Sequence, residues 1–328
     1  MTTYCLGGDL GSTGLRIVIA DAGGEVLSYA QAGPGNHEVV GFEGVKTNLS
    51  QAITKALEEA GLSLNQITGS GFGISGFDWP IEYAPHIELI RSLGLQGPLE
   101  IVNDAELGLL AGSEHGWGIA VVSGSGCNCR GWDRTRTKRG RVTGGGFFNG
   151  EFAGASDLML MTVRALSYEW IGRGPRTALS EAFVAKYGVK NLGELLEGIN
   201  CHSIDYDPED ARLVFQVAAD GDAVALELVR WAGRELGELA VTVIRQLNFE
   251  QVEFDLVQIG NMFEGSPLLT EQMKQRVHAI APAAKFTRLR EPPVLGAVLL
   301  AMDVAGVKSD ARTRARLSKS IAEATHLT

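Results

Sequence analysis

The sequence has few cysteines, no excess of basic residues and no long apolar run. Its four cysteines in 328 residues are too few for a disulfide framework, which favours a reducing compartment. No apolar run approaches the roughly 20 residues that cross a bilayer, and the start MTTYCLGGDLG lacks the basic and apolar regions of a signal peptide. Lys and Arg number 29 against 39 Asp and Glu, so a basic face for nucleic acid is not expected. We therefore expect a cytoplasmic protein that binds neither membranes nor nucleic acid.

Hydrophobic residues make up 45% of the chain, which excludes a disordered protein and allows a sizeable buried core. At about 100–200 residues per domain, the length predicts two globular domains.

Glycine, by contrast, is abundant. It accounts for 42 of the 328 residues, about twice the usual share of ~7%. The glycines gather beside strand-like runs, in GGDLGSTG (7–14), GSGFGISG (69–76), SGSGCNCRG (123–131) and TGGGFFNGEFAG (143–154). Because glycine lets a backbone approach other groups closely, we interpret these clusters as loops that touch a ligand.

A pattern of strand, glycine turn and strand occurs twice, once near the N-terminus and again after residue 117. In the first half, apolar spacing predicts a helix over 43–60, and a strand over 99–102 precedes another helix. These two halves predict α/β domains that face each other across a cleft.

The second half is expected to be mostly helical from 153 to 250, with its clearest helix over 222–247. A strand over 255–259 and an apolar helix over 294–304 follow. The polar tail from 308 is expected to be an exposed helix or a frayed end.

Two glycine hairpins, one in each half, have the chemistry of phosphate sites. The first is Asp9-x-Gly11-x-Thr13 and the second is Ser123-Gly-Ser-Gly126. Small residues leave N–H groups and hydroxyls open to a phosphate, and Asp9 at a strand end can organise a hydrated Mg²⁺. Either hairpin alone is also compatible with an ordinary turn, but the pair predicts a clamp on nucleotide phosphates. Neither has the spacing of a P-loop or a dinucleotide-binding loop.

Two further strand ends have residues of chemical interest. Asp104 follows the strand over 99–102 and precedes a helix. Its carboxylate can accept the proton of an attacking hydroxyl, or it can simply cap the helix. Gly260 and Asn261 follow the strand over 255–259, where small residues let a flat adenine lie against the backbone. The nearby Ser266-Pro267 is also an ordinary helix start.

These four pieces, in this order, resemble the superfamily of sugar kinases, heat-shock proteins and actin. Within it they are most similar to the BadF/BadG/BcrA/BcrD ATPase group, which includes N-acetylglucosamine kinases. The most specific match is SGSGCNCRG, which is close to the S-G-T-G-S-N-C-R pattern of those kinases. The resemblance implies two ribonuclease H-like, actin-like ATPase domains flanking a nucleotide cleft. The implied parts are an N-terminal domain (1–113), a C-terminal domain with a helical insert (114–292), a closing helix that returns to the N-terminal domain (293–306) and a polar tail (307–328).

The resemblance also implies roles for individual residues. Asp104 would be the catalytic base, and Asp9 would hold Mg²⁺ through water. The nucleotide would contact Gly11, Ser12, Thr13, Gly124, Ser125, Gly126, Gly260 and Asn261. The sugar would contact Asn36 and His37 in GPGNHE, together with Gly145, Gly146 and Glu151. The last of these lies in a stretch that departs from the family's G-G-W-G-x-x-x-G-D-E-G, because the tryptophan is missing and Glu151 replaces the aspartate. A longer carboxylate shifts its acceptor atoms by more than a hydrogen bond tolerates unless the backbone moves.

The function that the resemblance implies is that of an ATP- and Mg²⁺-dependent kinase. It would phosphorylate a primary hydroxyl of an amino or N-acetylamino sugar, N-acetylglucosamine first among them, and it would be a homodimer. One alternative is an ATPase that activates a partner enzyme through a shared iron–sulfur cluster. Because Cys127-x-Cys129 is too tightly spaced for ordinary cluster ligation, we interpret these cysteines as small residues on a strand. Another alternative is a non-catalytic ATP-binding regulator, which the altered stretch 144–154 leaves open.

Overall fold

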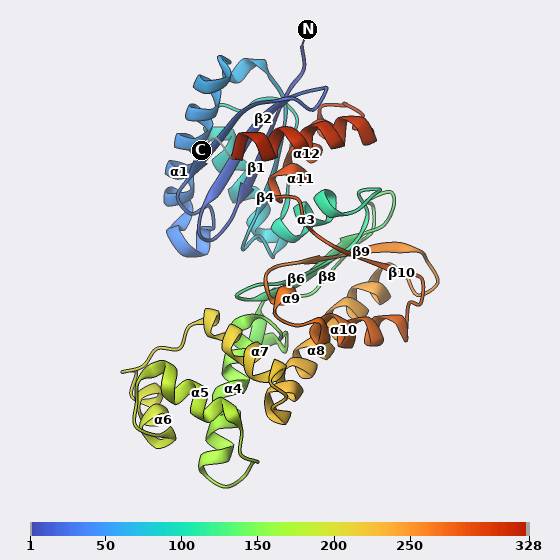
Figure 1. Cartoon of the computed structure of the whole chain (residues 1–328). Coiled ribbons are helices and arrows are strands. Elements are labelled where there is room, and N and C mark those ends of the chain that lie inside the picture. The colour runs from blue at the N-terminus through green and yellow to red at the C-terminus, as the bar shows by residue number, and fades with distance from the viewer. Residues whose placement is uncertain (1, 326–328) are drawn as a thin grey trace. The chain divides into compact units, whose positions relative to one another are not determined.

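The computed structural model describes residues 2–325 and contains two compact units, each built on a five-stranded sheet (Figure 1). One unit comprises the chain up to Ala120 together with the segment from Thr287 onward, and the other comprises Val121–Phe286. The repeated pattern of strand, glycine turn and strand therefore builds one sheet in each half of the molecule.

The sheet of the first unit has the strand order β3-β2-β1-β4-β5. Its strands are β1 (Tyr4–Leu10), β2 (Leu15–Asp21), β3 (Val26–Ala32), β4 (Ile67–Ile74) and β5 (Leu99–Asn103). The first three form an antiparallel meander, and β4 and β5 continue the sheet in parallel with β1. Because β1 and β5 are parallel in direction, Asp9 near the end of β1 and Asn103 at the end of β5 lie toward the same edge.

Helices cover both faces of this sheet. On one face, Leu6, Leu10 and other alternate strand residues pack with the buried side of α1 (His37–Ala60). On the other, Cys5 and Val18 pack with α11 (Val294–Val304) and α12 (Ala311–Thr325). In Figure 1 these last two helices, drawn in red, lie against the blue N-terminal strands. The remaining helical segments of the unit are η1 (Leu64–Gln66), η2 (Pro80–Glu82), α2 (Tyr83–Ser92) and α3 (Asp104–Gly112).

The glycine cluster at 69–76 was predicted to be a loop whose backbone approaches another group closely, and the loop part of that prediction is wrong. Its residues up to Ile74 form the buried strand β4. A Cβ added at Gly71 would lie 2.6 Å from the backbone oxygen of Ala297 and 2.6 Å from the nitrogen of Ala301. Atoms do not approach a Cβ so closely, so only glycine allows α11 to lie directly on this strand. A large part of the glycine excess therefore serves helix-to-sheet packing.

Two helix predictions also need correction. The helix expected over 43–60 begins earlier, at His37, and contains a kink at Gly41, whose φ is 67°. The polar tail is neither exposed throughout nor frayed, because α12 buries Leu317 and Ile321 against the sheet. The hydroxyl of Ser320 also accepts a hydrogen bond from the Val26 N–H at 2.9 Å.

The sheet of the second unit has the order β10-β9-β6-β7-β8. Its strands are β6 (Gly118–Ser123), β7 (Cys127–Trp132), β8 (Arg139–Arg141), β9 (Phe254–Ile259) and β10 (Ala284–Arg288). The long helix α8 (Ala223–Leu247) packs against β7, β8 and α10 (Pro267–His278). The other helical segments are η3 (Gly146–Asn149), α4 (Ala155–Trp170), α5 (Ala178–Tyr187), α6 (Leu192–Asn200), η4 (Pro208–Asp210), α7 (Ala211–Ala219) and α9 (Met262–Gly265).

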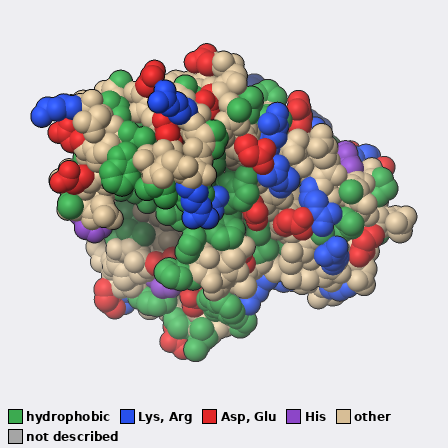
Figure 2. All heavy atoms as spheres, turned by 90° about the horizontal axis from the view of Figure 1, so that it is seen from below, with side chains coloured by type: hydrophobic (Ala, Val, Ile, Leu, Met, Phe, Trp, Pro, Cys, Tyr) green, Lys and Arg blue, Asp and Glu red, His purple; other side chains and the backbone are tan. Residues whose placement is uncertain are grey.

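The helices of the described chain include none that is both long and apolar enough to span a membrane. Figure 2 shows acidic and basic side chains interspersed on the face that it presents. This mixture fits the modest acidic excess of the sequence.

Candidate active site

The first glycine hairpin joins β1 to β2 through the turn Gly11–Gly14. The turn is closed by a hydrogen bond from the Gly11 N–H to the Gly14 oxygen at 3.1 Å, and the Gly35 N–H donates to the Gly11 oxygen at 2.9 Å. Ser12 and Thr13 are exposed at its tip. The local sequence therefore produces the open turn of small residues that a phosphate requires.

Asp9 lies beside this turn, opposite Arg16 in the register of β1 and β2. It is 5% exposed, and its Oδ2 lies 3.3 Å from an Arg16 guanidinium nitrogen. Burial raises the pKa of the Asp9 carboxyl, and Arg16 only partly offsets this effect. A nearby hydrated cation would offset the remainder, and Mg²⁺ is held by few carboxylates and several waters. The residues present thus fit the water-mediated magnesium site that the resemblance implies.

Asp104 is the first residue of α3, but it does not cap that helix. The cap is Asn103, whose side-chain oxygen accepts the Ala105 N–H at 3.0 Å, while Glu106 accepts the Asn103 N–H at 2.9 Å. The alternative prediction, in which Asp104 is the N-cap, is therefore wrong, because the N-cap is the preceding residue. Its partly exposed side chain stands at the carboxyl end of the edge strand β5 and at a helix N-terminus, where a negative charge is favoured.

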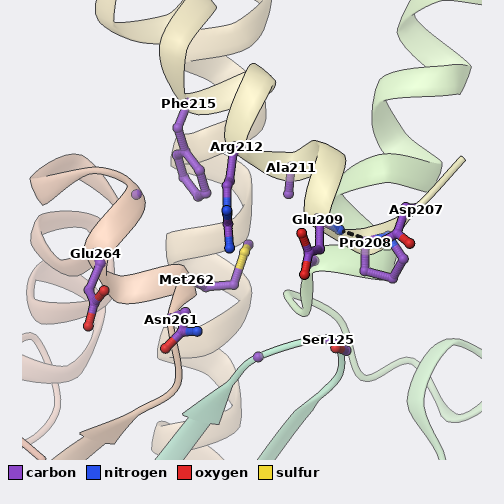
Figure 3. A pocket seen from close by; sticks show the side chains of 13 residues that line it. Ser125, Asp207, Pro208, Glu209, Ala211, Arg212, Phe215, Asn261, Met262 and Glu264 are labelled. Atoms are coloured by element: carbon purple, nitrogen blue, oxygen red, sulfur yellow. Dashed lines mark hydrogen bonds between the residues drawn. The ribbon is translucent and has the colours of Figure 1, made fainter. Parts of the chain in front are cut away.

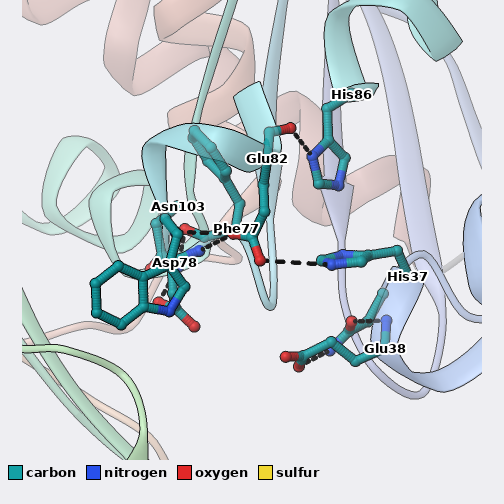
Figure 4. Close-up of polar contacts among 9 residues, drawn as sticks. His37, Glu38, Phe77, Asp78, Glu82, His86 and Asn103 are labelled. Atoms are coloured by element: carbon teal, nitrogen blue, oxygen red, sulfur yellow. Dashed lines mark hydrogen bonds and ion pairs between the residues drawn. The ribbon is translucent and has the colours of Figure 1, made fainter. Parts of the chain in front are cut away.

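A chain of polar contacts connects this strand end to His37 (Figure 4). The Asn103 side-chain amide donates to the Phe77 oxygen at 3.1 Å and to Asp78 Oδ1 at 3.4 Å. The Asp78 N–H donates to Glu82 Oε2 at 2.8 Å, and Glu82 Oε1 lies 3.7 Å from His37 Nε2. The segment 75–82 therefore fixes His37, which is predicted to contact a sugar, relative to the start of α3.

Asn36 and His37 occupy the start of α1. Asn36 is 5% exposed, and its side chain accepts the Glu38 N–H at 2.8 Å and donates to the Ser12 hydroxyl at 3.1 Å. His37 stacks on Phe42, with ring centroids 4.8 Å apart, and meets His86 edge-on at 4.9 Å. Burial lowers the pKa of His86, so this neighbour is neutral near pH 7. Asn36 thus connects the start of α1, where the two predicted sugar residues lie, to the first glycine hairpin.

The second glycine hairpin, Ser123–Gly126, joins β6 to β7. The Gly124 N–H donates to the Gly126 oxygen at 2.9 Å, and the Ala155 N–H donates to the Gly124 oxygen at 2.8 Å. A Cβ on Gly260 would lie 2.1 Å from the Ser123 oxygen, so the predicted adenosine residue lies directly against this hairpin. Ser125 is exposed, which leaves its hydroxyl accessible to a phosphate.

A cavity of about 500 Å³ opens beside the second hairpin (Figure 3). Gly124, Ser125 and Asn261, which the sequence predicts for the nucleotide, line it together. Its other wall was missed, because it comes from a helical segment some 85 residues further along the chain that has no recognisable motif. That wall consists of Asp207, Pro208, Glu209, Ala211, Arg212 and Phe215. The only available signal was a helix of strong amphipathic character, which α7 shares with many helices that bind nothing.

The stretch with Gly145, Gly146 and Glu151 forms a compact loop in the second unit. Glu151 is 6% exposed, and its two carboxylate oxygens accept the N–H groups of Thr143 and Gly144 at 2.5 and 2.8 Å. The longer side chain therefore closes its own loop. In that loop, Phe147 is 50% exposed.

The cysteines Cys127 and Cys129 lie on β7, as predicted. Burial, with smaller contributions from Asp157 and Glu151, raises the pKa of Cys127 to about 12. Burial also raises the pKa of Cys129. Both side chains are therefore neutral thiols on a strand. Within residues 2–325 no group of three or more His, Cys, Asp and Glu side chains is arranged to hold a metal ion.

A sequence model of the BadF/BadG/BcrA/BcrD ATPase family matches residues 6–301. The chain belongs to this family. It is 26% identical over 303 residues to an N-acetylmuramic acid/N-acetylglucosamine kinase of Clostridium acetobutylicum, covering 91% of this chain and 98% of that protein. It is 24% identical over 321 residues to an N-acetyl-D-glucosamine kinase of Dictyostelium discoideum, covering 91% of this chain and 97% of the other.

A crystal structure of a candidate N-acetylglucosamine kinase from Chromobacterium violaceum has the same fold. Its TM-score is 0.63 at 21% sequence identity, with 91% of this chain and 98% of the other covered. Family membership and the actin-like ATPase fold, both predicted from the glycine hairpins and their order, are thereby confirmed. Each unit also holds its own share of the predicted residues. The first unit contains Asp9, Gly11, Ser12, Thr13, Asn36, His37 and Asp104, and the second contains Gly124, Ser125, Gly126, Gly145, Gly146, Glu151, Gly260 and Asn261.

Proposed function

We propose that this family member is an ATP-dependent kinase that phosphorylates a primary hydroxyl of an amino or N-acetylamino sugar. The observation that carries the proposal is the position of Asp104 next to a helix cap that a different residue provides. Asn103 performs the capping of α3, so the helix does not require a carboxylate at position 104. The same Asn103 is connected through Asp78 and Glu82 to His37, which brings a carboxylate and sugar-side groups into one fixed arrangement.

In this proposal Asp104 accepts the proton of the sugar hydroxyl as the hydroxyl oxygen attacks the γ-phosphorus of ATP. The P–O bond to ADP then breaks in line with the attack. Asn36 and His37 orient the sugar, while the N–H groups and hydroxyls of the two glycine hairpins contact the phosphates. Mg²⁺ held through water by Asp9 would neutralise charge on the phosphates. The cavity beside Ser125 and Asn261 receives the nucleoside end of ATP.

Two features favour N-acetylamino sugars as the substrate class. Both curated relatives are named as N-acetylglucosamine kinases, and the match to this chain covers almost the whole length of each. The hairpin SGSGCNCRG, which resembles the pattern of such kinases, has an ordered connection to the start of α4 through Ala155 and Ser156. The tight spacing of Cys127 and Cys129, both on β7, weighs against an iron–sulfur activator.

The test is coupled measurement of ADP release by purified protein with N-acetylglucosamine, glucosamine, glucose or no sugar. We expect release that depends on sugar and Mg²⁺, and fastest with an amino or N-acetylamino sugar. ATP turnover that is independent of sugar would instead support the activator, and ATP binding without any turnover would support a regulator. Either outcome would overturn the kinase proposal.

A further inference from the structure

The cavity beside the second glycine hairpin contains one unexpected cation. Among the described residues that line it, Arg212 on α7 is the only Lys, Arg or His. The side chain is exposed, and no hydrogen bond or ion pair within residues 2–325 involves its guanidinium. In Figure 3, Arg212 extends from α7 into the cavity, toward Met262 and Asn261. A cation directed into a cavity without a protein partner is available to a ligand.

The composition of the cavity separates a phosphate end from a nucleoside end. Gly124 and Ser125 form one side, and there small residues and a hydroxyl suit phosphate. Around Arg212 the lining is different, because Phe215 and Met262 are apolar and Glu209 and Glu264 are acidic. Carboxylates repel phosphates but accept hydrogen bonds from ribose hydroxyls and from amino groups of a base. The surroundings of Arg212 therefore favour the nucleoside end.

The position of Arg212 is set by a buried anchor at the start of α7. Asp210, which is 5% exposed, immediately precedes that helix. Its carboxylate pairs with the Lys186 ammonium and accepts the Tyr187 hydroxyl, both from α5, and it also accepts the Asp207 N–H at 3.2 Å. One turn beyond Arg212, Phe215 lies against Gly265, where a Cβ would be 2.3 Å from its ring. The first turn of α7 is thus held from both sides, and Arg212 is presented by a rigid element.

We propose that Arg212 stacks its guanidinium on the base of the bound nucleotide and makes the main contribution to base affinity in this cavity. The planar guanidinium stacks on aromatic rings, whereas the ammonium of lysine is a compact point charge. The proposal rests on the proposed use of ATP. It goes beyond that use by assigning a residue of the helical insert to recognition of the base.

The test measures binding by calorimetry, without sugar, for a non-hydrolysable ATP analogue, ADP, AMP and inorganic tripolyphosphate. Arg212→Ala should lower the affinity for each of the three adenine nucleotides by a similar factor of about ten, as expected for loss of one stacking contact. The affinity for tripolyphosphate should stay unchanged. Arg212→Lys should not restore the affinity. Arg245→Ala, at an exposed arginine near the end of α8, is the matched control and should bind like the wild type.

Different results overturn different claims. A loss that grows from AMP to the ATP analogue, or that extends to tripolyphosphate, would make Arg212 a phosphate ligand and refute stacking. Full rescue by Arg212→Lys would also refute it, as would unchanged binding in Arg212→Ala. If the wild-type protein binds no adenine nucleotide, the proposed function fails together with this inference, whereas nucleotide binding that is insensitive to Arg212 overturns the inference alone.

Discussion

Replacing Asp104 by Asn removes one negative charge and leaves the shape of the side chain unchanged. Asp104 Oδ1 accepts the Ala105 N–H at 3.0 Å, and an amide oxygen can still accept it. The cap provided by Asn103 and the contact of Glu106 with the Asn103 N–H do not involve the lost charge. The substitution therefore tests the carboxylate itself.

The magnitudes of the two possible roles are well separated. A carboxylate in the first turn of a helix contributes about 0.3–1 kcal/mol through the helix dipole. Asp104→Asn should thus lower the free energy of unfolding by less than about 1 kcal/mol. Loss of a general base lowers the rate by about 10²–10⁴-fold, which corresponds to roughly 3–5 kcal/mol in the activation free energy. A catalytic role predicts a kinetic defect several times larger than the defect in stability.

Three measurements decide the matter: kcat from coupled ADP release, affinity for a non-hydrolysable ATP analogue, and urea unfolding. We expect kcat to fall at least a hundredfold, with nucleotide affinity unchanged. The control is Glu194→Gln, the same acid-to-amide change in the first turn of α6, where Glu194 accepts the Lys190 N–H at 2.7 Å. It should have a similar small effect on stability and none on kcat. A kcat of Asp104→Asn within about threefold of the wild type would refute the assignment of the base.

Three further predictions follow from the packing, the anchor and the altered loop. Gly71→Ala should lower the free energy of unfolding by about 1–3 kcal/mol or more, because its Cβ would meet the α11 backbone at 2.6 Å. Gly193→Ala, within α6, should cost clearly less in the same urea titration, because its Cβ would meet only side-chain atoms of Asn191 and Trp170, at 3.2 Å, and these can shift. Burial opposes ionisation of Asp210, but Lys186 and Tyr187 outweigh it and lower its pKa, so the anchor stabilises the fold above the ordinary Asp pKa of about 3.9 and loses that effect as pH falls through the lowered value. Lys186→Met should therefore lower the free energy of unfolding by about 1–3 kcal/mol at pH 7 and by progressively less below pH 4. An equal loss at pH 7 and below pH 4 would contradict the ion pair. Glu151→Gln should leave one of the Thr143 and Gly144 N–H groups without its acceptor, so limited proteolysis between 143 and 151 should accelerate while nucleotide affinity stays constant, and unchanged cleavage would contradict the closing role of this carboxylate.

The parts of the site that could be predicted are those encoded over a few adjacent residues. Each glycine hairpin contains its strand ends, its turn and its exposed hydroxyl within a dozen residues, so local geometry follows from local sequence. Asp104 was located correctly for the same reason. Its capping role was not, because Asn103 and Asp104 are both favourable caps and only the backbone angles of Asn103 select it.

The features that were missed depend on partners far away in the chain. The polar face of α12 dominates its sequence, and only the sheet shows why Leu317 and Ile321 are buried. The wall of the cavity beside the second hairpin joins Ser125 to Arg212 and Asn261, three segments that no local pattern connects.

The glycine excess also determines where the proposed base lies, although most of these glycines do not touch a ligand. A Cβ on Gly296 of α11 would lie 2.1 Å from the Leu107 oxygen of α3, and one on Gly73 of β4 would lie 2.1 Å from the Leu107 side chain. Two elements thus approach α3 more closely than any other residue type permits, and they do so within one turn of Asp104. A larger residue at either position would displace the helix that carries the carboxylate. Close packing in the core and precise placement of the proposed base are therefore two consequences of the same small residues.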